Sequence, residues 1–250
     1  MHPRSRFLES TVLCLLMLTV AGCGGPDNSS GEDSNPVIRD YAYDFGTGGN
    51  GWSAGFADLP ANADSSYELM TDPNAVLPES VRGVDNKGYR IVSHNRSDDA
   101  FSFLKRQVGG LVPRARYRAT FTLTFASDAP EAFAGIGGSP GLGVVVKAGA
   151  TAGEPNAVPL SGNPDFLVMN IDKGDNSSGG ANATVQGNVG IPGETAVYAL
   201  KTLTTPPGRE VSVTADSEGR VWLLVGTDSG FEGRTDLYHT EIRATLTPQP

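Results

Sequence analysis

The chain has 250 residues, with 19 Lys and Arg against 28 Asp and Glu, which gives a formal net charge of −9. This acidic balance argues against nucleic acid as a partner, because phosphate binding needs concentrated positive charge. Two cysteines and three histidines leave little material for a disulfide framework or a thiolate metal site.

The first 23 residues have the layout of an export signal. Arg4 and Arg6 precede a short apolar stretch at residues 11–20, and small residues then lead to Cys23. The apolar stretch is too short for a membrane-spanning helix. The last four residues, Val-Ala-Gly-Cys, resemble the lipobox of bacterial lipoproteins. The resemblance implies cleavage before Cys23 and acylation of Cys23, so that the lipid bilayer is a partner. The alternative is an ordinary secretory signal in which Cys23 has no special role.

The residues after Cys23 extend this prediction. Gly24 stands where the enteric sorting rule places Asp for retention at the inner membrane, so the resemblance implies a cell-envelope protein at the outer membrane. Cys14 leaves with the signal, and no cysteine then remains for a disulfide. Residues 24–36 (GGPDNSSGEDSNP) lack large apolar side chains and predict a flexible tether. The predicted organisation is a signal peptide at 1–22, a lipidated cysteine and linker at 23–36, and a single β-sandwich domain at 37–250.

From residue 37 onward the pattern predicts an all-β protein, an antiparallel β-sandwich of jelly-roll-like type. Two-residue alternation bounded by Gly, Pro, Asn and Asp recurs, whereas extended helical spacing does not. Residues 116–126 (RYRATFTLTFA) are the clearest strand, with one apolar face. Residues 221–225 (VWLLV) are apolar on both faces and predict a central strand with Trp222 in the core. Further strands are predicted at residues 41–45, 88–93, 100–108, 143–148, 166–171, 198–203, 211–215 and 237–246.

No catalytic motif predicts an enzyme. Residues 137–141 spell G-x-S-x-G, but Pro140 has no N–H to complete an oxyanion hole and no helix signal follows. Zinc-protease, phosphate-loop and dinucleotide motifs are absent from the sequence. The abundant carboxylates suit a glycoside hydrolase only where two of them face each other across a cleft, which sequence does not reveal.

Three polar, acidic loops predict a composite ligand site: residues 93–99, 172–180 and 227–236. Loops on a rigid β scaffold commonly carry ligand contacts, although turns are built from the same residue types. Phe231 lies in a polar, glycine-rich run and is predicted to be an exposed ring that stacks on a sugar. The candidate ligand-binding residues are His94, Asn95, Asp98, Asp99, Asp172, Lys173, Asp175, Asp228, Phe231 and Glu232. The acids could also hold calcium, but residues 172–175 lack EF-hand spacing, so only a site of another kind remains open.

Three segments resemble the beginning, middle and end of galactose-binding-like jelly-roll domains, the fold of many carbohydrate-binding modules. They are DFG with GW at residues 44–52, GLVP at 110–113 and YHTEIRA at 238–244. The resemblance implies binding of carbohydrate or a similar polar ligand without catalysis. It also implies a structural calcium held by Asp44 and Glu241, although Gly46 replaces the acid that commonly follows Asp-Phe. Residues 51–60, 97–106 and 169–180 are similar to a group of uncharacterised exported bacterial proteins. No activity can be transferred from that group.

The predicted function is therefore that of a membrane-anchored, non-catalytic binder of carbohydrate. Two alternatives remain open: a structural or adhesive envelope protein with a protein partner, and a glycoside hydrolase.

Overall fold

A computed structural model describes residues 35–83, 86–96 and 99–250. The chain divides into two compact units, Met1–Asp33 and Ser34–Pro250, of which the second is described. The predicted signal peptide, Cys23, most of the linker and Asp98 lie outside the described residues. Within these ranges, no helix is long and apolar enough to cross a membrane.

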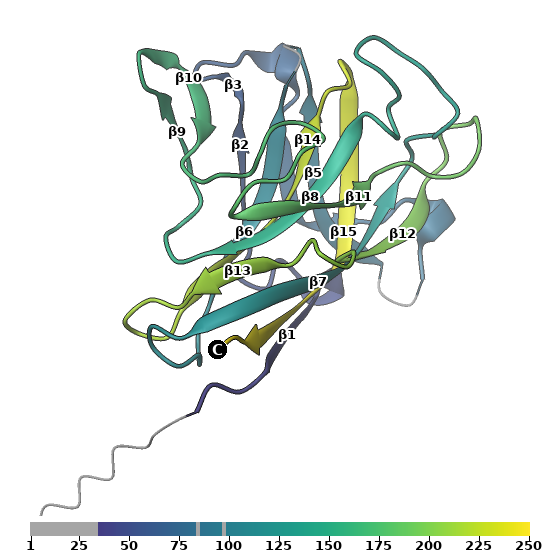
Figure 1. Ribbon diagram of the computed structural model, residues 1–250. Coiled ribbons are helices and arrows are strands. Elements are labelled where there is room, and N and C mark those ends of the chain that lie inside the picture. Colours follow the sequence, from purple (N-terminus) through teal and green to yellow (C-terminus); the bar gives the residue numbers. More distant parts are fainter. Residues whose placement is uncertain (1–34, 84–85, 97–98) are drawn as a thin grey trace, which may run out of the picture. The chain divides into compact units, whose positions relative to one another are not determined.

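Two antiparallel sheets pack face to face as a β-sandwich (Figure 1), which confirms the predicted fold class. The larger sheet has the order β12-β7-β15-β5-β4, with β1 paired to β15 and β13 paired to β7. Its strands are β1 (Arg39–Asp44), β4 (Met70–Val76), β5 (Lys87–His94), β7 (Arg116–Ser127), β12 (Ala199–Thr204), β13 (Val211–Thr214) and β15 (Arg234–Pro248).

The second sheet has the order β11-β8-β14-β6-β2, and a small sheet has the order β3-β10-β9. The strands of the second sheet are β2 (Ser53–Ala57), β6 (Phe101–Val108), β8 (Val144–Thr151), β11 (Ala183–Asn188) and β14 (Val221–Ser229). Those of the small sheet are β3 (Leu59–Pro60), β9 (Ala157–Leu160) and β10 (Asn163–Met169). Three short 3-10 helices, η1 (Phe45–Thr47), η2 (Ser65–Tyr67) and η3 (Glu79–Val81), lie in connections.

The main core lies between the two large sheets, and β7 shows how the sequence produces it. Tyr117, Phe121, Leu123 and Phe125 alternate along β7 and are all buried, as the alternation predicts. Strand β15, yellow in Figure 1, pairs with β7 along most of its length. A bulge at Thr240 shifts the register between them. The two longest strands therefore fix the centre of the larger sheet.

The five-stranded sheet is apolar on both faces, because a second cluster packs on the face that looks away from the main core. Along β14, Leu223 and Val225 enter the main core, whereas Leu224 points to the other side. There it packs with Phe101, Phe103 and other residues, namely Ala57, Met169 and Ala183. The outer face of this sheet is therefore covered by the chain's own segments.

Trp222 is not a core residue, and this prediction is wrong. It points to the same outer side as Leu224, and its side chain is only half-buried. Nζ of Lys105 lies 5.6 Å from the centre of its ring, within range of a cation–π interaction.

Candidate functional site

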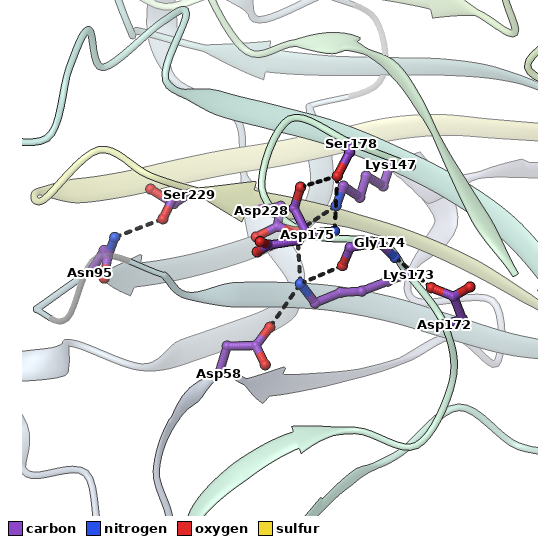
Figure 2. Close-up of polar contacts among 10 residues, drawn as sticks. All are labelled: Asp58, Asn95, Lys147, Asp172, Lys173, Gly174, Asp175, Ser178, Asp228 and Ser229. Atoms are coloured by element: carbon purple, nitrogen blue, oxygen red, sulfur yellow. Dashed lines mark hydrogen bonds and ion pairs between the residues drawn. The ribbon is translucent and has the colours of Figure 1, made fainter. Parts of the chain in front are cut away.

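A buried cluster of charged side chains joins the outer face of the five-stranded sheet to the segments that cover it. Nζ of Lys147 on β8 lies 2.6 Å from Oδ2 of Asp228 on β14, and both side chains are fully buried. Nζ of Lys173 lies 2.8 Å from the same oxygen and 2.9 Å from Oδ2 of Asp58. Figure 2 shows the Lys173 amine between these two carboxylates. Charges buried this deeply persist only when they are paired, so Lys173 fastens its segment to the sheet.

Asp99 completes the cluster as a neutral carboxylic acid. Asp58, Asp99 and Asp228 each place one oxygen so that the three lie within 4.8 Å of one another. Burial, followed by the hydrogen bond and negative charge of Asp228, raises the pKa of Asp99 to about 8. With Asp99 protonated, two carboxylates face the two ammonium groups of Lys147 and Lys173, and the cluster is neutral at pH 7. The two lysines supply the positive charge that a metal ion brings to such a group of acids.

Three predicted ligand-binding residues, one from each of the three loops, meet in this cluster: Asp99, Lys173 and Asp228. The structure brings them together, but Asp228 lies on strand β14 instead of a loop, and the three side chains face one another in the interior. Asn95 is also buried and donates from Nδ2 to the carbonyl of Ser229 over 2.7 Å. These residues hold the loops to the sheet.

His94 lies apart from the cluster, at the end of β5. Its Nδ1 is 3.1 Å from Oε1 of Glu68, which directly follows η2. The contact links the end of β5 to the segment between β3 and β4.

Asp172 closes the turn that carries Lys173. Its carboxylate accepts N–H bonds from Gly174 at 3.0 Å and Ala181 at 2.8 Å, and these bonds lower its pKa. A carboxylate that already accepts two backbone donors caps the loop in the way typical of Asx turns.

Asp175 lies in the same loop and also closes a turn. Its carbonyl accepts a hydrogen bond of 2.7 Å from Oγ of Ser178.

An open pocket of about 420 Å³ lies beyond the end of β7 and the beginning of β15. Its walls combine aromatic rings with carboxylates and a guanidinium group, a mixture that suits a polar ligand with apolar faces. The lining residues are Asp128, Ala129, Pro130, Phe133, Pro140, Glu194, Thr195, Ala196, Phe231, Arg234 and Asp236. Of the predicted ligand-binding residues that the structure describes, Phe231 alone lines this pocket.

Phe231 is half-buried and packs against the main core, so the prediction of an exposed ring is corrected. The reason is a glycine-rich loop that lies directly on the ring: a Cβ at Gly135 would be 2.7 Å from its Cε2 atom. Phe133 is the exposed ring of the pocket, with 54% of its surface accessible. Glu232 lies next to Phe231, and its main-chain N–H donates to the carbonyl of Ile136 over 3.0 Å.

Ser139, the serine of the rejected G-x-S-x-G sequence, lies in this loop and serves a turn. Its Oγ accepts N–H bonds from Gly141 and Leu142, both of 3.2 Å.

Two arginines hold the buried carboxylate at the pocket wall. Asp236 accepts a bidentate pair from Arg90, at 2.9 and 2.7 Å, and a third bond from Arg234 at 2.8 Å. Asp128 lies nearby, and burial together with the charge of Asp236 raises its pKa. Both oxygens of Asp236 are therefore occupied, which leaves Asp128 and the exposed Glu194 as the free acids of the pocket.

The predicted calcium pair, Asp44 and Glu241, lies in cross-strand register on β1 and β15. The two residues line a small pocket together with Lys87 and two threonines. Oδ1 of Asp44 accepts the N–H of Gly46 over 2.7 Å, and Glu241 pairs with Arg243 at 2.5 Å. The two acids that the resemblance indicated are therefore neighbours in the structure. Calcium binding by them stays a prediction.

The sequence analysis missed two of the five residues of the charged cluster, Lys147 and Asp58, and most of the pocket. Lys147 carried a usable signal, because it interrupts the apolar run VVVKAGA at 144–150, and a lysine within a buried strand needs a buried partner. Asp58, Asp128 and Glu194 carried no such signal, since acids in loops are common.

No protein-family model matches the chain, and no curated protein sequence matches it. Several solved structures are similar to the chain, with TM-scores below 0.4. A structure of promiscuous carbohydrate-binding modules of the β-sandwich superfamily is 11% identical with a TM-score of 0.30, and the match covers 85% of this chain and 57% of that chain. This chain therefore spans little more than half the length of that structure.

Two further structures match over nearly their full length. A carbohydrate-binding module from Caldicellulosiruptor saccharolyticus, solved with mannohexaose, is 11% identical with a TM-score of 0.33, over 81% of this chain and 96% of that chain. The K3 cleaved adhesin domain of Lys-gingipain from Porphyromonas gingivalis W83 is 10% identical with a TM-score of 0.36, over 83% and 98%.

Proposed function

We propose that the chain is a lipoprotein of the bacterial cell envelope, anchored through Cys23 and directed to the outer membrane, which binds carbohydrate or a similar polar ligand without catalysis. The observation that carries the binding proposal is the 420 Å³ pocket with its aromatic rings and acids. The anchor rests on the lipobox-like residues that precede Cys23.

The chemistry of the pocket fits a sugar in two ways. The exposed ring of Phe133, beside that of Phe231, offers an apolar surface for the C–H face of a pyranose. The carboxyls of Asp128 and Glu194 and the guanidinium of Arg234 offer hydrogen bonds to hydroxyl groups. A wall of rings and charged groups on a rigid β scaffold gives both affinity and orientation.

Asp236 itself is not available for hydrolysis. A glycoside hydrolase needs two carboxyl groups that are free to act on the scissile bond. Both oxygens of Asp236 are hydrogen-bonded to Arg90 and Arg234. This carboxylate therefore lines the site and does not act as a nucleophile.

A second candidate function is adhesion to a protein. Large apolar side chains with more than half of their surface exposed lie in the two segments that border the pocket: Ile136 and Leu142 in one, Val197 in the other. Exposed apolar residues that gather near one another are typical of interaction surfaces.

The test is a glycan array followed by calorimetric titration of the glycans that bind. The protein is the chain from residue 23 onward with Cys23→Ser, which removes the lipid. For a glycan that binds, Phe133→Ala should weaken binding about fivefold, because one aromatic contact contributes about 1 kcal/mol. Phe133 is exposed, so this change leaves the core intact.

Trp222→Ala is the matched control, because it removes a half-buried ring on the outer face of the five-stranded sheet. Loss of binding in Trp222→Ala with full binding in Phe133→Ala would place the site on that face and refute the pocket. Absence of binding to every glycan on the array would favour the protein partner, and Ile136→Ser would then be the first variant to compare.

A further inference from the structure

The side chains of the closest ion pair in the buried cluster are placed for a covalent bond to form between them. Lys147 and Asp228 project from the adjacent strands β8 and β14 on the same outer face, diagonal neighbours whose side chains meet. Their side chains are fully buried, with Nζ 2.6 Å from Oδ2. An amine and a carboxyl group held at this distance, on two rigid strands and away from water, are placed for condensation.

A proton-transfer group stands beside the pair. The carboxyl of Asp99 lies beside that of Asp228, with an oxygen of each within 4.8 Å of the other, and burial keeps it protonated at neutral pH because its pKa is raised to about 8. Amide formation needs a proton delivered to the leaving oxygen and another taken from the nitrogen. A neutral carboxyl group performs both transfers at once.

We propose that Lys147 and Asp228 form an intramolecular isopeptide bond, with Asp99 as the proton-transfer group. The ammonium of Lys147 first gives a proton to the Asp228 carboxylate, which produces a neutral amine and a neutral acid. The Nζ lone pair then attacks Cγ of Asp228. Asp99 gives its proton to the departing hydroxyl group and takes one from the nitrogen, so that it ends as it began. One C–N bond forms, one C–O bond breaks, and one water molecule leaves.

The remaining charges select Lys147 over Lys173 as the nucleophile. Lys173 lies 2.9 Å from Asp58, so conversion of its amine to an amide would remove the cation that the buried Asp58 carboxylate contacts. Reaction of Lys147 instead leaves Lys173 paired with Asp58, and Asp99 as a neutral donor to the new amide carbonyl. Each charge of the product has a partner, as a buried site requires.

The bond would join two strands through residues that are 81 positions apart in the chain. Figure 2 shows the pair within the group of contacts that holds the 172–180 loop to the sheet. A cross-link over so long a separation restricts the unfolded chain, as a disulfide does, in a protein whose predicted mature form has no cysteine pair.

Peptide mapping of the purified full-length protein tests the proposal directly. Trypsin does not cleave after an acylated lysine, so the bond predicts residues 119–173 as one peptide joined to residues 221–234, with a mass lower than their sum by one water molecule. Lys147→Met should release residues 221–234 as a free peptide. Lys105→Met, which removes another lysine of the same sheet, should leave the joined peptide unchanged.

Three further results bear on the assignment. Free peptides 119–147 and 221–234 from the folded wild-type protein would overturn the proposal, and this result does not depend on whether any variant folds. A link between residues 148–201 and 221–234 would assign the nucleophile to Lys173 and refute the assignment to Lys147. In Asp99→Asn, which keeps the shape of the side chain, we expect the joined peptide to be lost, and its full retention would refute the role of Asp99.

Discussion

His239 is a buried imidazole without a partner on Nδ1. It lies on β15 beside Phe125, with ring centroids 5.9 Å apart, and only 2% of its surface is accessible. Nδ1 forms no hydrogen bond with any residue that the structure describes. Burial lowers the pKa of His239 to about 4, so the folded protein holds it neutral throughout the physiological range.

This burial predicts a loss of stability in mild acid. Unfolded His239 takes up a proton as the pH falls through about 6.5, whereas the folded form stays neutral until about pH 4. Between these values the unfolded state binds more protons, so the free energy of unfolding falls, by on the order of 3 kcal/mol for this group. Urea denaturation at pH 7 and pH 4.5 should show a smaller fall in His239→Phe than in the wild type.

The control is His94→Gln, which removes the half-buried imidazole paired with Glu68. This variant should keep the wild-type fall between the two pH values. Equal falls in His239→Phe and the wild type would show that His239 is not held neutral by the fold. The comparison between variants also removes the opposing contribution of Asp99, whose raised pKa makes its own contribution decline as the pH rises.

At the scale of elements, the five-stranded sheet depends on a close approach between β8 and the segment that covers it. Gly149 lies on β8, and a Cβ there would collide with the main chain of Asn182 and Ala183. Because these atoms are backbone, they cannot move aside as a flexible side chain does. The glycine thus allows the 172–182 loop to lie flat on the sheet over the second apolar cluster.

Gly149→Ala should therefore displace this loop and expose Phe101 and Leu224. We expect a cost of about 1–3 kcal/mol in the free energy of unfolding, typical of overpacking. Cleavage within residues 172–182 in limited proteolysis should become faster. Gly153→Ala is the control, because a Cβ at Gly153 meets nothing within 4 Å. Similar proteolysis of both variants would refute the role of Gly149 as a docking point.

The strands themselves show what alternation predicts and what it does not. All ten predicted strands exist, because each places apolar side chains on at least one buried or partly buried face. Five others were missed: β2, β3, β4, β9 and β11. Strand β4 has the sequence MTDPNAV and is exposed at all but one position, so no apolar pattern marks it. Its pairing with β5, including a bulge between Asp72 and Ala75, comes from tertiary context.

At the scale of the whole molecule, one part of the candidate sites was predictable from the sequence and the other part was not. Loop composition indicated three loops, and one residue from each meets in the buried cluster. Sequence could not tell that Asp99, Lys173 and Asp228 face inward, because their burial depends on Phe101 and Phe103 and on the loop packed over them. The pocket combines segments around residues 128–140, 194–196 and 231–236, whose proximity only the folded chain defines.

The last prediction concerns the attachment of the whole molecule to a membrane. The chain is acidic, with a net charge of −9, so electrostatic attraction to anionic lipid headgroups does not favour membrane binding. A lipid on Cys23 supplies about 0.8 kcal/mol per buried methylene, and several acyl chains together make a stable anchor. Cells grown with a labelled fatty acid should therefore carry the label on the wild-type protein, which should sediment with the outer membrane.

Cys14→Ala changes the other cysteine, within the signal, and should retain label and membrane association. Cys23→Ala should lose the label, since the proposed acceptor is the sulfur of Cys23. Label retained in Cys23→Ala would show that the chain is attached elsewhere, and an unlabelled, soluble wild-type protein would mean that its export signal is an ordinary secretory one.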